Sequence, residues 1–366
     1  MLCRVCVGRL ALEVIGGDNP AMQAMYQVAL RPPSEIKGVR RRMARDTDNG
    51  QPSWLTRKLQ RDGDMDRSRE AALQTYFRQL AQLLPGEQKH FPALESGGGA
   101  QTRARAMAMF RNQRGTRPEG TEDTEGEEDS AGPDPRARSA AQAQTLSVLR
   151  ELDGERKGRL LCFLHGSGLV GKEALIVLDG ADLNDTVLHK GDLWGINLSG
   201  ANLRRADLSE TKLPSALLQA ADLREANLSN TDMWAANLNH ADLTRTQATA
   251  ANLGGANLSK AYLYEAYFAA ADFTTAKMTE VNLALADLTG AVLSKADLHA
   301  AILWGSKLIG ADLSEADLSG ADLIAADLSR ANLARANLRW ARVSPEQLQQ
   351  AGSLEGTTMP DGTRHK

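Results

Sequence analysis

Cysteine, aromatic residues and long apolar runs are all scarce in this chain of 366 residues. The three cysteines, Cys3, Cys6 and Cys162, are too few for a disulfide framework and favour a reducing, cytoplasmic compartment. Cys3 and Cys6 form one C-x-x-C without a second pair at zinc spacing. We interpret them as incidental thiols, with a zinc or redox role as the weaker alternative. Aromatics make up only 4% of the residues, which is low for an enzyme core and is compatible with a repeat architecture.

An excess of charge of one sign is also missing, because 43 basic residues nearly balance 46 acidic ones. This balance does not favour nucleic acid as a partner. No stretch reaches the roughly 18 apolar residues of a membrane span. Residues 2–16 are fairly apolar, but Arg4, Arg9 and Glu13 interrupt them, and the segment lacks a clear signal-peptide cleavage site. We therefore expect a soluble chain.

Residues 1–65 show weak periodicity and are predicted to be a poorly ordered N-terminal arm. The arm carries a cluster of basic side chains: Lys37, Arg40, Arg41, Arg42 and Arg45. A solvated arm is the simpler interpretation of this cluster. The alternative is contact with lipid headgroups, which would give peripheral membrane association.

Helices are predicted on both sides of a linker. Residues 66–91 contain an amphipathic pattern that ends at Pro85-Gly86 and predicts a helix. Residues 92–137 are rich in glycine and in charge blocks of opposite sign, which is typical of a disordered linker. Residues 138–175 again show helical periodicity and predict two short helices. The apolar stripe of the first helix is Ala72, Leu73, Tyr76, Phe77, Leu80, Leu83 and Leu84.

A five-residue repeat then runs through residues 176–343. Every fifth residue from Leu178 to Val343 occupies a position that we call the centre, and Leu fills 28 of these 34 positions. Two residues before the centre, Ala occurs in 25 of the 34 repeats. One residue before the centre, Asp occurs 13 times and Asn 9 times, so the consensus is A-[DN]-L-x-x.

A period of five fits neither an α-helix nor a flat strand, so each repeat must turn a corner. One large and one small side chain per repeat point inward, and the other three positions face water. The Asp before each Leu is interpreted as a residue that organises the local backbone turn rather than as an acid or base.

This pattern resembles the pentapeptide repeat family. The resemblance implies a mainly β fold, a right-handed quadrilateral β-helix with four repeats per coil. The 34 repeats would make about 8.5 coils, or a shaft about 40 Å long at the spacing of stacked strands. The R-E-A-A-L-Q segment at 69–74 and L-D-G-E-R-K-G at 152–158 resemble a bacterial subgroup with helices before the repeats.

Because four repeats complete a coil, side chains that lie four repeats apart are expected to stack. The one small centre, Ala248, then lies beside Phe268 of the next coil, whose ring can fill the space that Ala leaves. Six outward aromatics form a candidate partner-binding surface, although they could also only cover the backbone ladder. They are Tyr262, Tyr264, Tyr267, Trp304, Trp194 and Trp234.

Both ends of such a solenoid need protection because they expose an apolar cross-section. The helices of residues 138–175 are the predicted N-terminal cap. At the other end, Ser344, Pro345 and Gln347 predict a capping box and a helix over 345–351, within a C-terminal capping segment at 344–366.

No catalytic constellation is visible, and no cofactor or metal site is predicted. His240 and His299 fall three coils apart, about 14 Å, which is too far for a shared metal. The glycine-rich segment 166–172 lacks the spacing of a phosphate-binding loop. We expect a non-enzymatic scaffold that binds an unknown protein partner. The alternatives are a DNA mimic acting on a topoisomerase such as gyrase, and a membrane-associated scaffold held by the basic arm.

Overall fold

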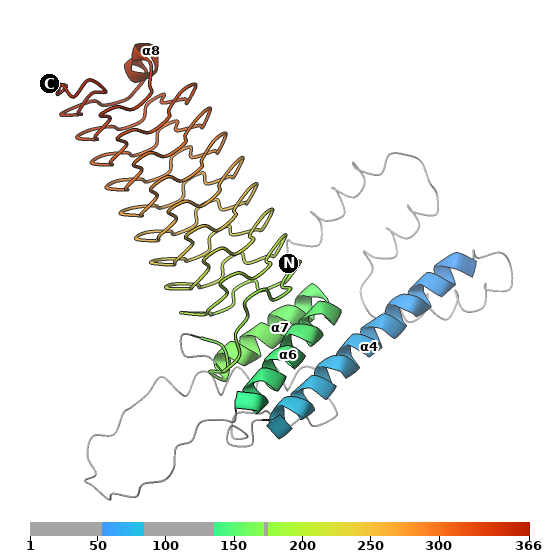
Figure 1. Cartoon of the computed structure of the whole chain (residues 1–366). Helices are drawn as coiled ribbons and strands as arrows, with labels where there is room; N and C mark the ends of the chain where they lie inside the picture. The colour runs from blue at the N-terminus through green and yellow to red at the C-terminus, as the bar shows by residue number, and fades with distance from the viewer. Residues whose placement is uncertain (1–52, 84–134, 172–174) are drawn as a thin grey trace, which may run out of the picture. The chain divides into compact units, whose positions relative to one another are not determined.

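The computed structural model describes residues 53–83, 135–171 and 175–366. Of these, residues 53–67 belong to one unit and the remainder to a second. The described helices are α4 (Ser53–Leu83), α6 (Pro135–Glu151), α7 (Gly154–Gly166) and α8 (Pro345–Gln349) (Figure 1). Helix α4 begins at Ser53, well before residue 66. Residues 53–65 include Leu, Arg, Lys and Gln, which favour helix. Cys3, Cys6, the basic cluster at 37–45 and most of the predicted linker lie outside the described residues.

Residues 175–343 form a stack of coils held by parallel pairing between residues four repeats apart. The pairs run without interruption from Asp182 with Asn202 to Asp322 with Arg342. Within the ladder, the N–H of each centre donates to a carbonyl of the next coil, as from Leu183 to Asn202 at 2.8 Å. Each coil therefore contains four pentapeptides and bonds only to its neighbours.

The core consists of the two inward columns that the repeat predicts. Every centre from Leu178 to Leu338 is buried, and so are the alanines two residues before them. Thr or Ser replaces Ala at five positions, and each of these side chains is buried. Four of the hydroxyls donate to a backbone carbonyl, as from Thr211 to Leu188 at 2.9 Å and from Thr231 to Leu208 at 2.8 Å. The small column accepts these hydroxyls because a carbonyl lies within reach, whereas the Thr186 hydroxyl of the first coil has no partner among the described residues.

Each corner depends on two local features. The residue two positions after the centre has a positive φ, between 55° and 60° at Asp185, Glu225 and Lys260. The Asp or Asn before the centre accepts a bond from the N–H two residues later, as at Asp222 and Arg224 (3.2 Å). The predicted role of the Asp column in organising turns is confirmed.

One coil has an enlarged aromatic core. Phe268 and Phe273 are fully buried, and their ring centroids lie 5.1 Å apart at a steep angle. Ala248, also fully buried, donates its N–H to the carbonyl of Tyr267, which places it beside Phe268 of the next coil. This arrangement is the one expected from the four-repeat interval.

Helix α7 closes the N-terminal end of the stack (Figure 1). Asp153 is its N-cap, and the carbonyl of Gly154 accepts a bond from the N–H of Val187 at 2.9 Å. A Cβ on Gly154 would lie 1.9 Å from the Asp185 carbonyl oxygen, and one on Gly158 would lie 2.0 Å from that of Val187. Only glycine allows the helix backbone to approach the first coil this closely.

Helix α8 and the tail close the other end. The predicted capping box is present: Ser344 accepts from the N–H of Gln347, and Gln347 accepts from that of Ser344. The Gln347 amide also donates to the carbonyls of Leu323 and Ala326 at 2.7 Å each. The Ala326 carbonyl is one that the backbone of a further coil would otherwise bond. The helix ends two residues before 351, and Ser353 and Thr358 then pair with Asn332 and Asn337. The tail thus adds part of a further coil.

Candidate interaction surface

The outward aromatics predicted as a partner surface lie on the coil exterior. Trp194, Trp234, Tyr262, Tyr267 and Trp304 are exposed, and Tyr264 is half-buried. The four-repeat interval divides them between sides. Tyr264 and Trp304 occupy one column, whereas Trp194 and Trp234 lie half a coil away. Tyr267 lies in the pentapeptide that follows Tyr262 and Tyr264, in neither of these places. The structure therefore does not bring the six together; it makes two separate aromatic sites and leaves Tyr267 outside both.

The larger site is a contiguous apolar surface on one side of four successive coils, which we call the apolar patch. Its members share three adjacent columns, and in the two middle coils no charged residue occupies these columns. They are Tyr262, Tyr264, Leu285, Ile302, Trp304 and Ile324, with the nearly buried Ala284 between them. Leu285 crowds Gly305 of the next coil, since a Cβ on that glycine would lie 2.8 Å from Leu285 Cδ2.

Ion pairs border the apolar patch along the stack. On the N-terminal side Arg245 Nε lies 2.6 Å from Glu265 Oε2, and Glu265 also bonds the hydroxyl of Tyr264. The hydrogen bonds from Arg245 and Tyr264 hold the pKa of Glu265 below its usual range. On the C-terminal side Arg342 pairs with Asp322 at 2.8 Å. Charges at both borders are thus already neutralised, and the patch has the apolar centre and polar rim of a protein interface.

Toward the N-terminus, the same side of the stack is charged rather than apolar. Its first coils carry arginines in place of apolar residues, and each arginine has an acidic partner: Arg204 with Glu225, Arg205 with Asp185, and Arg224 with Asp222 and Asp242. The bond from Arg205 lowers the pKa of Asp185. Apolar and charged residues are therefore segregated along the axis, which a structural covering of the ladder alone would not require.

The two helical motifs of the sequence meet at the N-terminal cap. Glu70 accepts from Arg156 Nε at 3.0 Å, and Arg69 lies 3.7 Å from Asp153. Burial by itself would raise the pKa of Asp153, but bonds from the Arg156 backbone and guanidinium outweigh it and lower that pKa. The cap is therefore an ionic network that joins α4 and α7.

A second ionic contact joins the cap to the first coil. Lys157 Nζ donates to Asn184 Oδ1 at 2.6 Å and lies 3.6 Å from Asp182, although only 4% of its side chain is exposed. Burial lowers the pKa of Lys157, and Asp182 opposes that effect. A buried lysine of this kind is stable only with its partners in place, so it fixes α7 on the solenoid.

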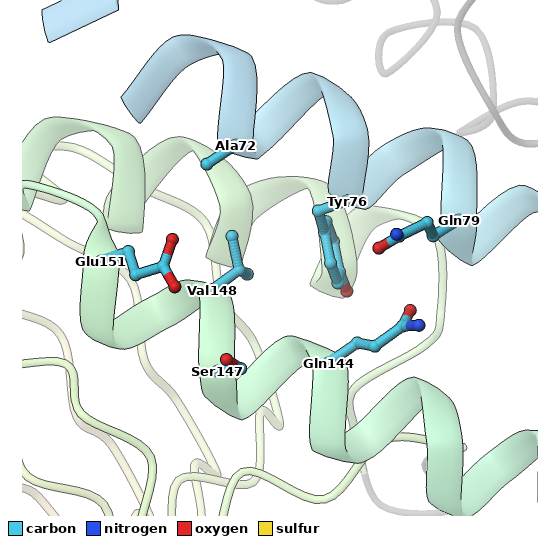
Figure 2. A pocket seen from close by; sticks show the side chains of 7 residues that line it. All are labelled: Ala72, Tyr76, Gln79, Gln144, Ser147, Val148 and Glu151. Atoms are coloured by element: carbon cyan, nitrogen blue, oxygen red, sulfur yellow. The ribbon is translucent and has the colours of Figure 1, made fainter. Parts of the chain in front are cut away.

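The cavity between α4 and α6 is small. It has a volume of about 170 Å³ and is lined by side chains of both helices, among them Tyr76, Gln79 and Gln144 (Figure 2). Tyr76 bonds the buried hydroxyl of Thr145 at 2.8 Å, and burial raises the pKa of its phenol. The Gln144 carbonyl oxygen has no hydrogen-bond partner among the described residues. The lining of the cavity includes one charged residue, Glu151, and we interpret the space as a packing gap of the cap.

No group of three or more metal-binding side chains occurs within residues 53–83, 135–171 and 175–366. His299 Nδ1 contacts the Ser319 hydroxyl at 3.0 Å, and His189 Nδ1 contacts the Ser209 hydroxyl at 3.0 Å.

Burial raises the pKa of the Cys162 thiol. The raised pKa disfavours the thiolate, which is the reactive form of cysteine. None of the described helices is long and apolar enough to cross a membrane.

The model of the family described as pentapeptide repeats matches residues 181–344 in five overlapping or adjoining segments. The chain belongs to the pentapeptide repeat family. The fold of its solenoid is accordingly a right-handed β-helix, preceded here by helices. Comparison with curated proteins found no match.

Several solved structures are similar to the solenoid. HetL, involved in heterocyst differentiation regulation in the cyanobacterium Nostoc sp. strain PCC 7120, is 34% identical over 51% of this chain and 92% of its own, with a TM-score of 0.25. Rfr23 of the cyanobacterium Cyanothece 51142 is 32% identical over 23% of this chain and 58% of its own, with a TM-score of 0.23. QnrB1, a plasmid-mediated fluoroquinolone resistance protein, is 21% identical over 50% of this chain and 84% of its own, with a TM-score of 0.29. The fold assignment rests on the repeat and the family match, not on these superpositions.

Sequence reasoning missed three members of the apolar patch, Leu285, Ile302 and Ile324. It selected aromatic residues only, whereas aliphatic residues complete the surface. The signal was available, because these residues fall in the columns of the patch when the sequence is written with four repeats to a row. Glu70, Arg156 and Lys157 of the cap lie in the two sequence motifs at 69–74 and 152–158, but the sequence did not predict which of these residues pair.

Proposed function

We propose that this protein is a non-enzymatic scaffold in which a rigid four-sided shaft of about 8.5 coils binds another protein through the apolar patch. The observation that carries the proposal is the clustering of Tyr262, Leu285, Ile302, Trp304 and Ile324 in three adjacent columns of one side of the stack, where Asn282 is the one polar residue of the two middle coils apart from glycine. Their exposed area is on the order of 400–500 Å², within the range of about 300–600 Å² for the largest apolar patch of a typical monomer, which is often functional. Aromatic anchors surrounded by aliphatic residues are typical of interface hot spots.

The test compares capture of partners by the full chain and by the Trp304→Asp variant. Trp340→Asp is the matched control, because Trp340 is also exposed but lies outside the patch, with the Arg339 guanidinium 4.5 Å from its ring centroid. We expect Trp304→Asp to lose a partner from a crosslinked native lysate that Trp340→Asp retains. Equal recovery by both variants would contradict the proposal.

DNA mimicry directed at a topoisomerase is the weaker candidate. Residues 176–343 hold 15 Asp and 5 Glu against 6 Lys and 8 Arg, a net charge of −6. These acids are spread over all four pentapeptides of the coil rather than gathered in one stripe, and several pair with Arg or Lys. Inhibition of gyrase supercoiling by the purified protein would favour this candidate over the apolar patch.

We place the scaffold in the cytoplasm on the basis of its few cysteines. Association with a membrane surface through Lys37, Arg40, Arg41, Arg42 and Arg45 remains a proposal from sequence. Sedimentation with anionic vesicles at low salt tests it, and a chain that stays in the supernatant contradicts it.

A further inference from the structure

The second aromatic site is a column on the opposite side of the coil from the apolar patch. Trp194, Pro214, Trp234 and Gly254 occupy the same position in successive coils. Backbone bonds from Gly195 to Pro214 (2.9 Å) and from Ser215 to Trp234 (2.8 Å) join their coils. The two tryptophans are 65% and 56% exposed. They are therefore two exposed anchors on a rigid frame, with a proline between them.

The spacing of the tryptophans is fixed by the coil. Two coils separate them, so their backbones lie about 9–10 Å apart along the axis. A polyproline II helix repeats every three residues, over about 9.3 Å. Two prolines three residues apart in an extended ligand would thus meet the two indoles in register. Aromatic-lined surfaces that bind proline-rich segments use this preformed helix.

Small residues keep the column open. A Cβ on Gly254 would lie 3.5 Å from Trp234 Cδ1, so the indole lies against that glycine. Gly195 and Gly255 occupy the next column, where a Cβ on Gly195 would meet nothing within 4 Å. The flanking residues on that side are therefore small, and His165 of α7 contacts the Trp194 carbonyl oxygen at 3.0 Å.

The charge beside the column defines the ligand further. Over the coils that carry Trp194, Pro214 and Trp234, the adjacent column holds Asp192, Lys212 and Asp232, a net charge of −1. Within the described part of the chain no cation forms an ion pair with Asp232. Asp272 lies in the same column, two coils beyond Trp234. The net charge of this edge is negative, which complements Arg or Lys in a ligand.

We propose that the Trp194–Trp234 column binds a proline-rich segment of a partner protein that carries basic residues and lies lengthwise along the shaft in the polyproline II conformation. The inference rests on the proposed scaffold function, of which it defines one partner class on a separate side. Self-association is the poorer explanation, because two exposed indoles offer roughly 300 Å², well below the about 800 Å² per partner of a stable interface.

The experiment measures fluorescence anisotropy of a short labelled synthetic peptide with two prolines three residues apart and two arginines, titrated with the full chain. We expect binding in the micromolar to submillimolar range. Trp194→Ala and Trp234→Ala should each weaken binding about tenfold or more. Asp232→Asn keeps the local bond to the Trp234 N–H and should weaken binding a few fold, more at low salt than at high.

Three controls make the result decisive. Trp304→Ala changes another exposed tryptophan, half a coil away, and should leave peptide binding unchanged. Peptides with both prolines replaced by alanine, or spaced four residues apart, should bind at least tenfold more weakly. Circular dichroism verifies that each variant is folded.

The inference is overturned if the peptide does not bind at about 1 mM, or if Trp194→Ala and Trp234→Ala bind as the parent does. Loss of binding in Trp304→Ala would also overturn it, since the peptide would then occupy the apolar patch. If the peptide fails but Trp304→Asp still loses a lysate partner, this inference falls and the scaffold function stands. If the peptide binds while no patch-dependent partner exists, the proposed role of the patch falls instead.

Discussion

The packing of Ala248 beside Phe268 yields a prediction that is specific to this solenoid. In most coils two leucines stack at the centre, whereas here one small and one large residue share the space. We consider three variants: Ala248→Leu, Phe268→Leu, and the double substitution, which restores two stacked leucines. If the residues compensate each other, the double variant should be more stable than the sum of the single ones implies.

The magnitudes follow from burial. Phe268 is fully buried, so Phe268→Leu removes about two methylene equivalents at about 0.8 kcal/mol each and leaves a small cavity, together about 1.5–2.5 kcal/mol. Ala248→Leu inserts a large side chain into a filled core and should cost about 1–3 kcal/mol. In the double variant both costs largely cancel. What remains is loss of the edge-to-face contact between Phe268 and Phe273, worth about 1 kcal/mol.

Urea unfolding followed by circular dichroism measures the three free energies of unfolding, with hydrogen exchange of coil amides as a local readout. We expect a coupling energy of at least about 1.5 kcal/mol between the two sites. The control cycle pairs Ala248→Leu with Phe273→Leu, which changes a buried ring of the same coil that does not stack on Ala248; its coupling should be smaller. Additive effects of Ala248→Leu and Phe268→Leu would refute the compensation.

The remaining predictions concern the two ends. Gly158→Ala places a Cβ about 2.0 Å from the Val187 carbonyl oxygen and should detach α7, seen as lost exchange protection of the Val187 amide; Gly171→Ala, whose Cβ meets nothing within 4 Å, should be neutral. Because the pKa of Asp153 is lowered in the folded state, its contribution to stability is present above the unfolded pKa and is lost as pH falls through the folded one. Acid titration followed by exchange of α7 amides should therefore show the cap loosening below about pH 4, and Asp153→Asn, which preserves the N-cap, should remove this dependence. Gln347→Ala removes two bonds to solenoid carbonyls and should lower the free energy of unfolding by about 1–3 kcal/mol in urea titrations; an unchanged midpoint would contradict the capping role.

The repeat register predicted most of the solenoid, because a single fixed interval determines which residues are buried and which stack. Leu and Ala mark the two inward columns, and Asp or Asn marks the turn. The capping box at Ser344 was also readable, since it depends on residues that are close in sequence. Local spacing carries this information without any tertiary contact.

The contacts at the ends were not predictable in the same way. Glu70 and Arg156 are 86 residues apart, and no periodicity links them. The tail was expected to be a capping segment only, yet Ser353 and Thr358 rejoin the ladder because the α8 segment adds one residue to the interval between paired positions. The apolar patch was partly predictable. The repeat register places its residues in adjacent columns, but the patch is recognised only when aliphatic and aromatic residues are considered together.

The proposed function requires that a partner protein binds at the apolar patch. Its most direct test is site-specific photo-crosslinking in cells, with a photoreactive phenylalanine analogue at Trp304 and, as the control, at Ser229 on a polar side of the coil. We expect a discrete crosslinked species from position 304, identified by mass spectrometry, and none from position 229. Crosslinks that are equal at both positions, or missing at 304, would contradict it.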